Sequence, residues 1–133
     1  MIIRCEGRDG LVREFHYEYR FDELDKVWHF FVYIDPRPAS NEVFDMTFTP
    51  ISETTVRQTS IFHHHEPAYK AMGIPDAMLP VVKAILGKEV ESSPLAGNEG
   101  GVFRSPDAEK MWRRFATKGI AEYDDVKGVY RVK

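Results

Sequence analysis

Apolar and polar side chains alternate along the first half of the chain, which is the pattern of half-buried β-strands. The predicted strands are residues 11–19, 27–34, 42–49 and 54–62. The run 27–34 is apolar on both faces, so it predicts a central strand. Only short links separate these runs, and short links between consecutive strands predict an antiparallel meander.

The spacing of apolar positions changes in the second half. From Asp76 they fall three and four residues apart, which predicts a helix that ends at Gly87. Pro80 lies inside this stretch, so we expect an irregular first turn. A second helix is predicted to begin at residues 105–107, where serine, proline and aspartate provide an N-cap, a first-turn proline and a first-turn acid. It is expected to end at Gly119.

Three short strands complete the predicted order, at residues 88–92, 121–123 and 129–132. Residues 94–101 contain three glycines and are predicted to form a loop. The 133 residues suit a single domain. We therefore predict one α+β domain over residues 1–133, with a mixed, mostly antiparallel twisted sheet and two main helices.

Composition narrows the classes of function. Hydrophobic residues make up 43% and charged residues 29% of the chain, as in ordinary globular proteins. The net charge of −3 argues against a nucleic-acid partner bound through bulk charge. No apolar run approaches the length of a membrane span, so we expect no membrane partner. A charge already appears at the fourth residue, Arg4, which argues against a signal peptide. Cys5 is the single cysteine, so no disulfide can form within the chain. Together these features favour a cytoplasmic location.

The segment with candidate chemistry runs from residue 65 to residue 79, where a strand ends, the chain turns and a helix begins. Backbone amides at a helix start lack intrahelical partners and lie at the positive end of the helix dipole, so they can hold a phosphate. Gly73 would let a ligand approach the backbone, and Lys70 adds a positive charge. The spacing alone is also typical of any turn from a strand through a glycine into a helix.

This segment resembles the coenzyme A loop of the GCN5-related N-acetyltransferase (GNAT) superfamily. In that family the pattern Val-x-Pro-x-x-(Arg/Gln)-x-x-Gly-x-(Gly/Ala) follows a central strand and precedes a helix rich in alanine and leucine. The order of predicted elements after residue 27 is also similar to the family's, and residues 105–123 look like its last helix and the strand after it. The positions of the loop and helix that match are Pro67, Tyr69, Gly73, Ile74, Ala77, Met78 and Leu79.

The resemblance implies an acyl-CoA-dependent N-acyltransferase whose acceptor is an amine on a small molecule or a protein. The thioester of acetyl-CoA, or of another acyl-CoA, would lie between the strand ending at His63 and the strand 88–92. A homodimer is also implied by the family. The implied coenzyme-binding residues are His63, His65, Lys70, Ala71, Met72, Gly73 and Ile74.

Catalysis of this kind needs a base for the amine and an acid for the thiolate. Under the resemblance, His65 and Glu66, together with His63, are the candidates for the base. Tyr130 is the candidate for the acid, and Tyr123 is an alternative.

The chain departs from the family's pattern at several positions. Lys70 stands where arginine or glutamine is usual, and Ala71 replaces a loop glycine. Pro75 occupies the last glycine or alanine position and has no N–H to donate. Trp112 stands where the family has its acid tyrosine. The N-terminal helix pair is missing, so we expect a trimmed GNAT-like fold with weakened or altered catalysis.

Two other interpretations remain. The first is a protein-interaction module on the same fold, without enzymatic activity, which would use its exposed aromatic strands. The second is a metal site in residues 63–66, three histidines and a glutamate. On a strand, His63 and His65 share one face while His64 and Glu66 share the other, so at most two ligands converge. Zinc needs three or four ligands, and we therefore expect no metal.

Overall fold

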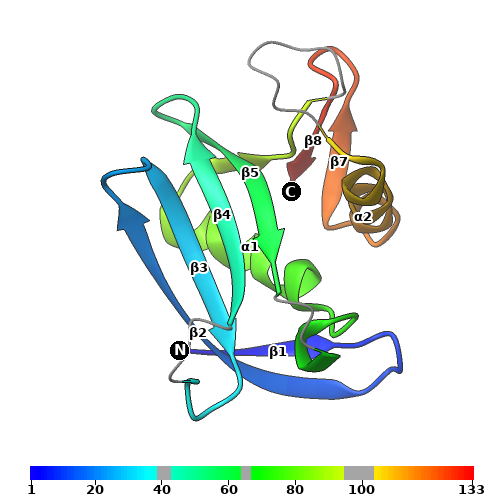
Figure 1. Ribbon diagram of the computed structural model, residues 1–133. Coiled ribbons are helices and arrows are strands. Elements are labelled where there is room, and N and C mark those ends of the chain that lie inside the picture. Colours follow the sequence, from blue (N-terminus) through cyan, green and yellow to red (C-terminus); the bar gives the residue numbers. More distant parts are fainter. Residues whose placement is uncertain (39–42, 64–66, 95–103) are drawn as a thin grey trace. The chain divides into compact units, whose positions relative to one another are not determined.

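The computed structural model describes residues 1–38, 43–63, 67–94 and 104–133 (Figure 1). Their strands hydrogen-bond in the order β1-β2-β3-β4-β5-β6-β8-β7. The predicted α+β class, with a mixed and mostly antiparallel sheet and two helices, is therefore confirmed. The elements in chain order are β1 (Ile2–Glu6), β2 (Val12–Asp22), β3 (Val27–Tyr33), β4 (Phe44–Pro50), β5 (Thr55–Phe62), a 3₁₀ turn (Pro67–Tyr69), α1 (Ile74–Leu86), β6 (Glu89–Glu91), α2 (Pro106–Thr117), β7 (Ala121–Asp124) and β8 (Val129–Val132).

The chain divides into two compact units. The first comprises Met1–Thr49 and Ser60–Met78, and the second comprises Pro50–Thr59 and Leu79–Lys133. The boundaries fall inside β5 and α1, so both of these elements contribute to each unit. The single domain over residues 1–133 stays a prediction.

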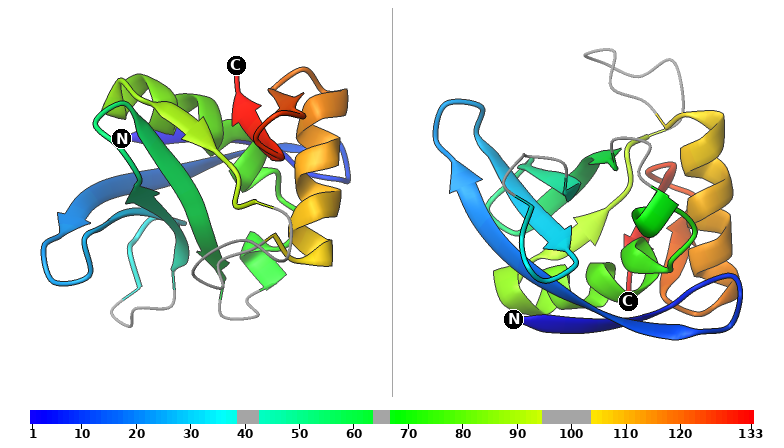
Figure 2. Two further views of the ribbon diagram at one scale, coloured as in Figure 1. Left: turned by 90° about the horizontal axis from the view of Figure 1, so that it is seen from above. Right: turned by 60° about the horizontal axis from the view of Figure 1, so that its bottom comes forward.

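The first unit contains the first three strands of the predicted antiparallel meander. Its longest strand, β2, has 11 residues and bends from one partner to the next, as Figure 2 shows. Residues up to His16 pair with β1, and those from His16 onward pair with β3. β3 then pairs antiparallel with β4. Alternate side chains of the strands fill the core, where Phe15, Phe30 and Phe48 are almost completely buried.

The face of β3 opposite this core carries a row of stacked side chains, which we call the stacked row: His29, Phe31, Arg37, Tyr33 and His16. The rings of His29 and Phe31 are nearly parallel, with centroids 5.3 Å apart. The guanidinium of Arg37 lies 5.4 Å from the ring centroids of both Phe31 and Tyr33. His16 stacks on Tyr33 at 6.0 Å. Arg37 follows the strand, so these contacts fold the residues after β3 back onto the sheet.

The second unit is built on a parallel strand pair. The amino-terminal residues of β5, Thr55–Arg57, pair in parallel with β6. Parallel strands need a crossover connection, and α1 belongs to the connection that joins β5 to β6. β8 then pairs antiparallel with β6 on one side and with β7 on the other. On α2, Trp112 packs its ring on Tyr130 of β8, with 6.0 Å between the ring centroids.

The second predicted helix is confirmed, including its start. The hydroxyl of Ser105 accepts a hydrogen bond from the Ala108 N–H at 3.1 Å, and Pro106 occupies the first turn. This is the N-cap that the sequence predicted. The helix ends at Thr117, and Gly119 follows in the left-handed region with φ +79°.

The first predicted helix begins two residues before Asp76. α1 starts at Ile74, and Pro80 lies inside it without ending it. Gly87 follows with φ +62°, as a C-terminal glycine is expected to do. No helix in the described residues is both long enough and apolar enough to span a bilayer.

Strand β1 is the element that periodicity did not predict. The two later strands lie where they were expected, and the strand predicted over 88–92 is shorter, at Glu89–Glu91. Residues 95–101 of the predicted loop lie outside the described residues, as does residue 42 of the third predicted strand.

The stacked row generates a test of stability. Arg37 contacts two rings and forms an ion pair with Glu18, whereas Arg20 contacts the ring of Phe31 alone. We expect Arg37→Ala to lower the free energy of unfolding by about 1.5 kcal/mol and Arg20→Ala by about 0.5 kcal/mol. Urea denaturation of both variants measures the difference. Equal losses would show that the second ring and the ion pair contribute nothing.

Candidate functional site

The turn that precedes α1 is the segment for which the sequence predicted a phosphate site. It begins with the 3₁₀ turn, in which Tyr69 is buried and lies 6.4 Å from the ring of Phe15. Lys70 and Ala71 follow and are exposed. Ala71 has φ +57° and Gly73 has φ +76°, so the backbone enters the left-handed region twice before the helix begins.

Gly73 is pressed against β1. A Cβ atom added to Gly73 would lie 2.1 Å from the carbonyl oxygen of Glu6 and 2.9 Å from its carbonyl carbon. Next to this contact, the Arg8 N–H donates a hydrogen bond to the Ala71 carbonyl at 3.0 Å. The sequence pattern predicts that Gly73 lets a ligand approach the backbone. Its packing on β1 alone already requires a glycine at this position.

The amino-terminal turn of α1 carries a negative charge of its own. Asp76 lies in this first turn, where an acid complements the helix dipole. Burial, and after it the charge of Asp76, raises the pKa of the Cys5 thiol to about 11. Pro75 contributes no N–H. A phosphate at this helix end would therefore meet an existing carboxylate and one donor fewer.

The contact at Gly73 can be separated from its backbone conformation. Gly10 also has a positive φ, +80°, but a Cβ there would have no neighbour within 4 Å. We expect Gly10→Ala to cost about 1 kcal/mol through conformation alone. Gly73→Ala should cost about 3 kcal/mol, because a clash with backbone adds to the same conformational term. Chemical denaturation measures both values, and similar losses in the two variants would rule out the packing role.

The remaining predicted site residues differ in burial, and two of them lie outside the described residues. His63, directly after β5, is half-buried, as is Met72 in the turn. Ile74 is completely buried at the start of α1. His65 and Glu66, the candidate bases, lie outside the described residues.

Tyr130, the candidate acid, belongs to the second unit, whereas the turn before α1 belongs to the first. Its side chain is buried, and its hydroxyl donates a hydrogen bond to Glu109 at 3.2 Å. The guanidinium of Arg104 lies 5.0 Å from the centre of its ring. Burial and the nearby carboxylate raise the pKa of Tyr130, so the phenol stays protonated at neutral pH. Its proton is already engaged with Glu109.

Arg104 organises this part of the second unit. Its side chain is only 1% exposed and donates to Glu109 at 2.5 Å. It also donates to the Ser92 hydroxyl at 3.1 Å and to the carbonyls of Ser93 and Gly128 at 2.8 and 3.1 Å. A buried guanidinium is stable only when its donors find acceptors, as they do here. The sequence pattern does not identify Arg104, because an arginine before a helix cap carries no local signal of burial.

The pairing of Glu109 predicts a pH dependence of stability. Burial opposes its ionisation, but the hydrogen bond and charge of Arg104 outweigh burial and lower the pKa below its usual value. A lowered pKa in the folded state gives stability that is complete above the unfolded value of about 4.5 and is lost as the pH falls through the folded value.

We therefore expect the stability difference between the wild type and Glu109→Gln to shrink as the pH falls from 7 to 3. Urea denaturation at each pH measures it. Asp125→Asn, at an exposed position in the turn after β7, serves as the control and should follow the wild-type profile. A constant difference across this range would contradict the pairing.

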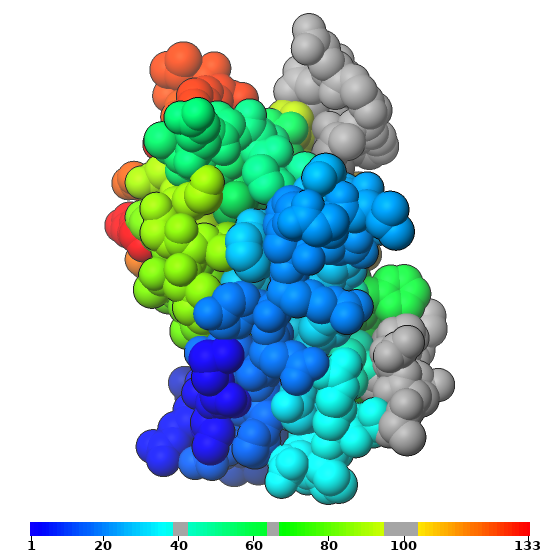
Figure 3. All heavy atoms as spheres, turned by 90° about the vertical axis from the view of Figure 1, so that its left-hand side faces the viewer, coloured from blue at the N-terminus to red at the C-terminus, as the bar shows by residue number. Residues whose placement is uncertain are grey.

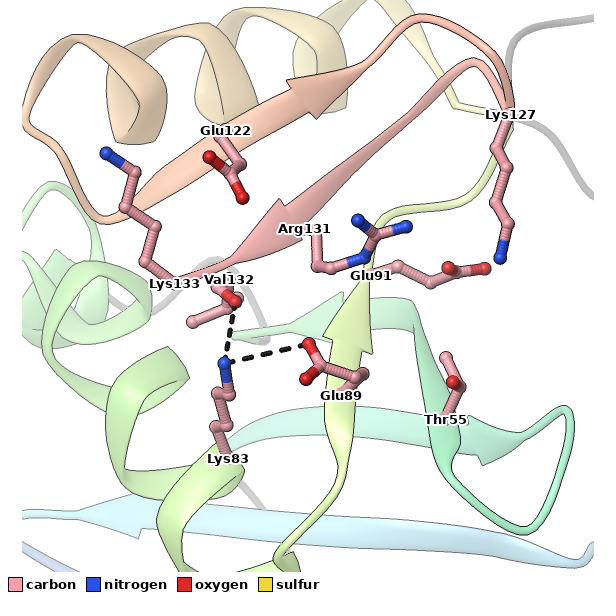
Figure 4. Close-up of a pocket in the computed structure, with 9 residues that line it drawn as sticks. All are labelled: Thr55, Lys83, Glu89, Glu91, Glu122, Lys127, Arg131, Val132 and Lys133. Atoms are coloured by element: carbon pink, nitrogen blue, oxygen red, sulfur yellow. Dashed lines mark hydrogen bonds and ion pairs between the residues drawn. The ribbon is translucent and has the colours of Figure 1, made fainter.

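A charged pocket of about 650 Å³ lies in the second unit (Figure 4). Its residues come from α1, the strands β5 to β8, the turn between β7 and β8 and the residue after β8. Lys83 donates to the Val132 carbonyl at 3.1 Å and lies 3.6 Å from the carboxylate of Glu89. The lining residues are Thr55, Lys83, Glu89, Glu91, Glu122, Lys127, Arg131, Val132 and Lys133.

Charges of alternating sign cross the sheet beside this pocket. Arg57 pairs in register with Glu91, Glu91 with Arg131, and Arg131 with Glu122. Arg57 and Glu91 form an ion pair at 3.3 Å, and Arg131 forms one with Asp124 at 2.7 Å. The charged groups thus compensate one another, and the row stabilises strand pairing. The sequence could not predict it, because the row depends on the register of four strands.

Within the described residues, no group of three histidine, cysteine, aspartate or glutamate side chains is placed to hold a metal ion. His64, His65 and Glu66 lie outside this description. In comparisons with known proteins, no family model, curated protein or solved structure matches the chain. A functional proposal therefore rests on the residues and geometry described above.

Proposed function

We propose that this chain binds an acyl-coenzyme A and transfers its acyl group to an amine. The observation that carries the proposal is the connection from β5 through the turn and α1 to the parallel strand β6. In sheets with parallel strands, ligands bind beyond the carboxyl ends of the strands, and phosphates bind at the start of the following helix. The resemblance of the sequence to the GNAT superfamily also supports the proposal, because the residues that match the family's coenzyme A loop lie in this same connection.

In this proposal the diphosphate lies on residues 70–74, and the pantetheine runs along residues 63–65. The amine nitrogen attacks the thioester carbonyl, a C–N bond forms, and the C–S bond breaks to release the thiolate of coenzyme A. Glu66 or His65 accepts the proton that the amine loses, and the thiolate takes up a proton, for which the sequence offers Tyr130 as the candidate donor. The acceptor is an amine on a small molecule or a protein, and the fold is a GNAT-like core without the N-terminal helix pair.

Two features of the described residues limit this activity. Asp76 lies at the helix end that the diphosphate would approach, so its charge weakens binding. The hydrogen bond from Tyr130 to Glu109 must break before the phenol can serve as an acid. We therefore expect modest affinity and slow turnover.

Binding is tested by titrating the purified protein with acetyl-CoA. The ligand should raise the melting temperature, because binding to the native state at 100 times Kd adds about 2.7 kcal/mol of stability. Asp76→Asn should tighten binding about threefold by removing the opposing charge. Asp107→Asn is the matched control, since Asp107 lies in the first turn of α2, and it should leave the affinity unchanged. Absence of both a thermal shift and heat of binding at millimolar acetyl-CoA would refute the proposal.

A second candidate function is a protein-interaction module without enzymatic activity. It is favoured by exposed apolar side chains in the β1–β2 hairpin, where Ile2, Leu11 and Val12 are 57%, 58% and 62% exposed. A homodimer would be one such association. The acetyl-CoA titration separates the two candidates, because an interaction module gives no ligand-dependent stabilisation.

A further inference from the structure

We infer that Arg8, from the hairpin between β1 and β2, joins Lys70 in holding the diphosphate of the coenzyme. The inference rests on the proposed function and adds a residue from a distant part of the sequence to that site. It assigns to the hairpin the bidentate donor that the turn itself lacks, since Lys70 stands where the GNAT loop has arginine or glutamine.

The hairpin is fixed to the turn through its backbone. The Arg8 N–H donates to the Ala71 carbonyl at 3.0 Å, and Ala71 directly follows Lys70. A Cβ on Gly7 would lie 3.3 Å from this same carbonyl, and the Glu6 carbonyl is in contact with Gly73. Three consecutive hairpin residues therefore lie against the turn. This places the α-carbon of Arg8 beside the residue that follows Lys70.

Both cations are available to a ligand. Arg8 and Lys70 are exposed, and neither forms an ion pair with any residue that the structure describes. The neighbouring Asp9 does not neutralise Arg8, because Arg13 binds both of its carboxylate oxygens, at 3.2 and 2.6 Å. The hydrogen bond from Arg13 lowers the pKa of Asp9 to about 2.

A guanidinium beside an ammonium group favours a diphosphate as the ligand of this site. A guanidinium presents paired donors that match two phosphate oxygens, while an ammonium acts as a compact point charge. One of each suits a doubly charged diphosphate better than it suits a single carboxylate. Glu6 and Asp76 also lie on this part of the first unit, so one cation alone would leave the local charge negative, whereas Arg8 and Lys70 together balance the two carboxylates.

The test compares dissociation constants measured by calorimetry. Arg8→Ala keeps the backbone N–H that binds Ala71, so the hairpin should stay in place. We expect it to weaken acetyl-CoA binding about tenfold, the effect of losing a charge-assisted contact. Arg4→Ala, which removes an exposed arginine of β1 that pairs with Glu14, is the control and should change the constant less than about twofold.

S-acetylpantetheine, which has no diphosphate, provides the second probe. Its affinity should be the same for Arg8→Ala and the wild type. If Arg8→Ala binds acetyl-CoA as tightly as Arg4→Ala does, the inference about Arg8 is refuted and the proposed function stands. If Arg8→Ala weakens both ligands equally, the residue acts on the fold rather than on the diphosphate, which also overturns the inference. If the wild type binds neither ligand, the proposed function fails together with the inference.

Discussion

The first unit depends on a close approach between two backbone segments that are distant in sequence. The carbonyl of Glu6, at the end of β1, fills the space where any residue other than glycine at position 73 would carry its Cβ. The hydrogen bond from the Arg8 N–H to the Ala71 carbonyl is a second backbone contact between the same two segments. Together they join the first strand to the turn from which α1 begins, so the start of that helix is positioned by the amino-terminal strand.

In the second unit a single buried cation has the comparable role. Arg104 lies beside Tyr130, reaches carbonyls after β6 and before β8, and binds Glu109 on α2. A buried guanidinium without acceptors would be strongly unfavourable. The surrounding acceptors are therefore needed to keep Arg104 buried. The unit is thus organised around an electrostatic requirement, whereas the first unit is organised around a steric one.

Local patterns predicted the local structure. The alternation around Phe30 and the cap at Ser105 identify a central strand and a helix start, because the signal for each lies within a few residues. The docking of β1 could not be predicted in the same way. It depends on the Glu6 carbonyl, which every residue type has, and Gly73 is consistent with either ligand approach or backbone packing. The charged row through Glu91 could not be predicted from the sequence either, since it exists only once four strands have adopted their register.

The contacts of Arg104 bear on how far the sequence between residues 94 and 104 can change in length. Its backbone N–H donates to the Pro94 carbonyl at 2.6 Å, and its side chain binds the Ser93 carbonyl, so the two ends of residues 95–103 are held together from outside that segment. When the ends of a connection are fixed in this way, doubling its length costs only about 0.6 kcal/mol of closure entropy. Insertions and exchanges of sequence can therefore accumulate between Pro94 and Arg104 while the strands and helices around them keep their packing.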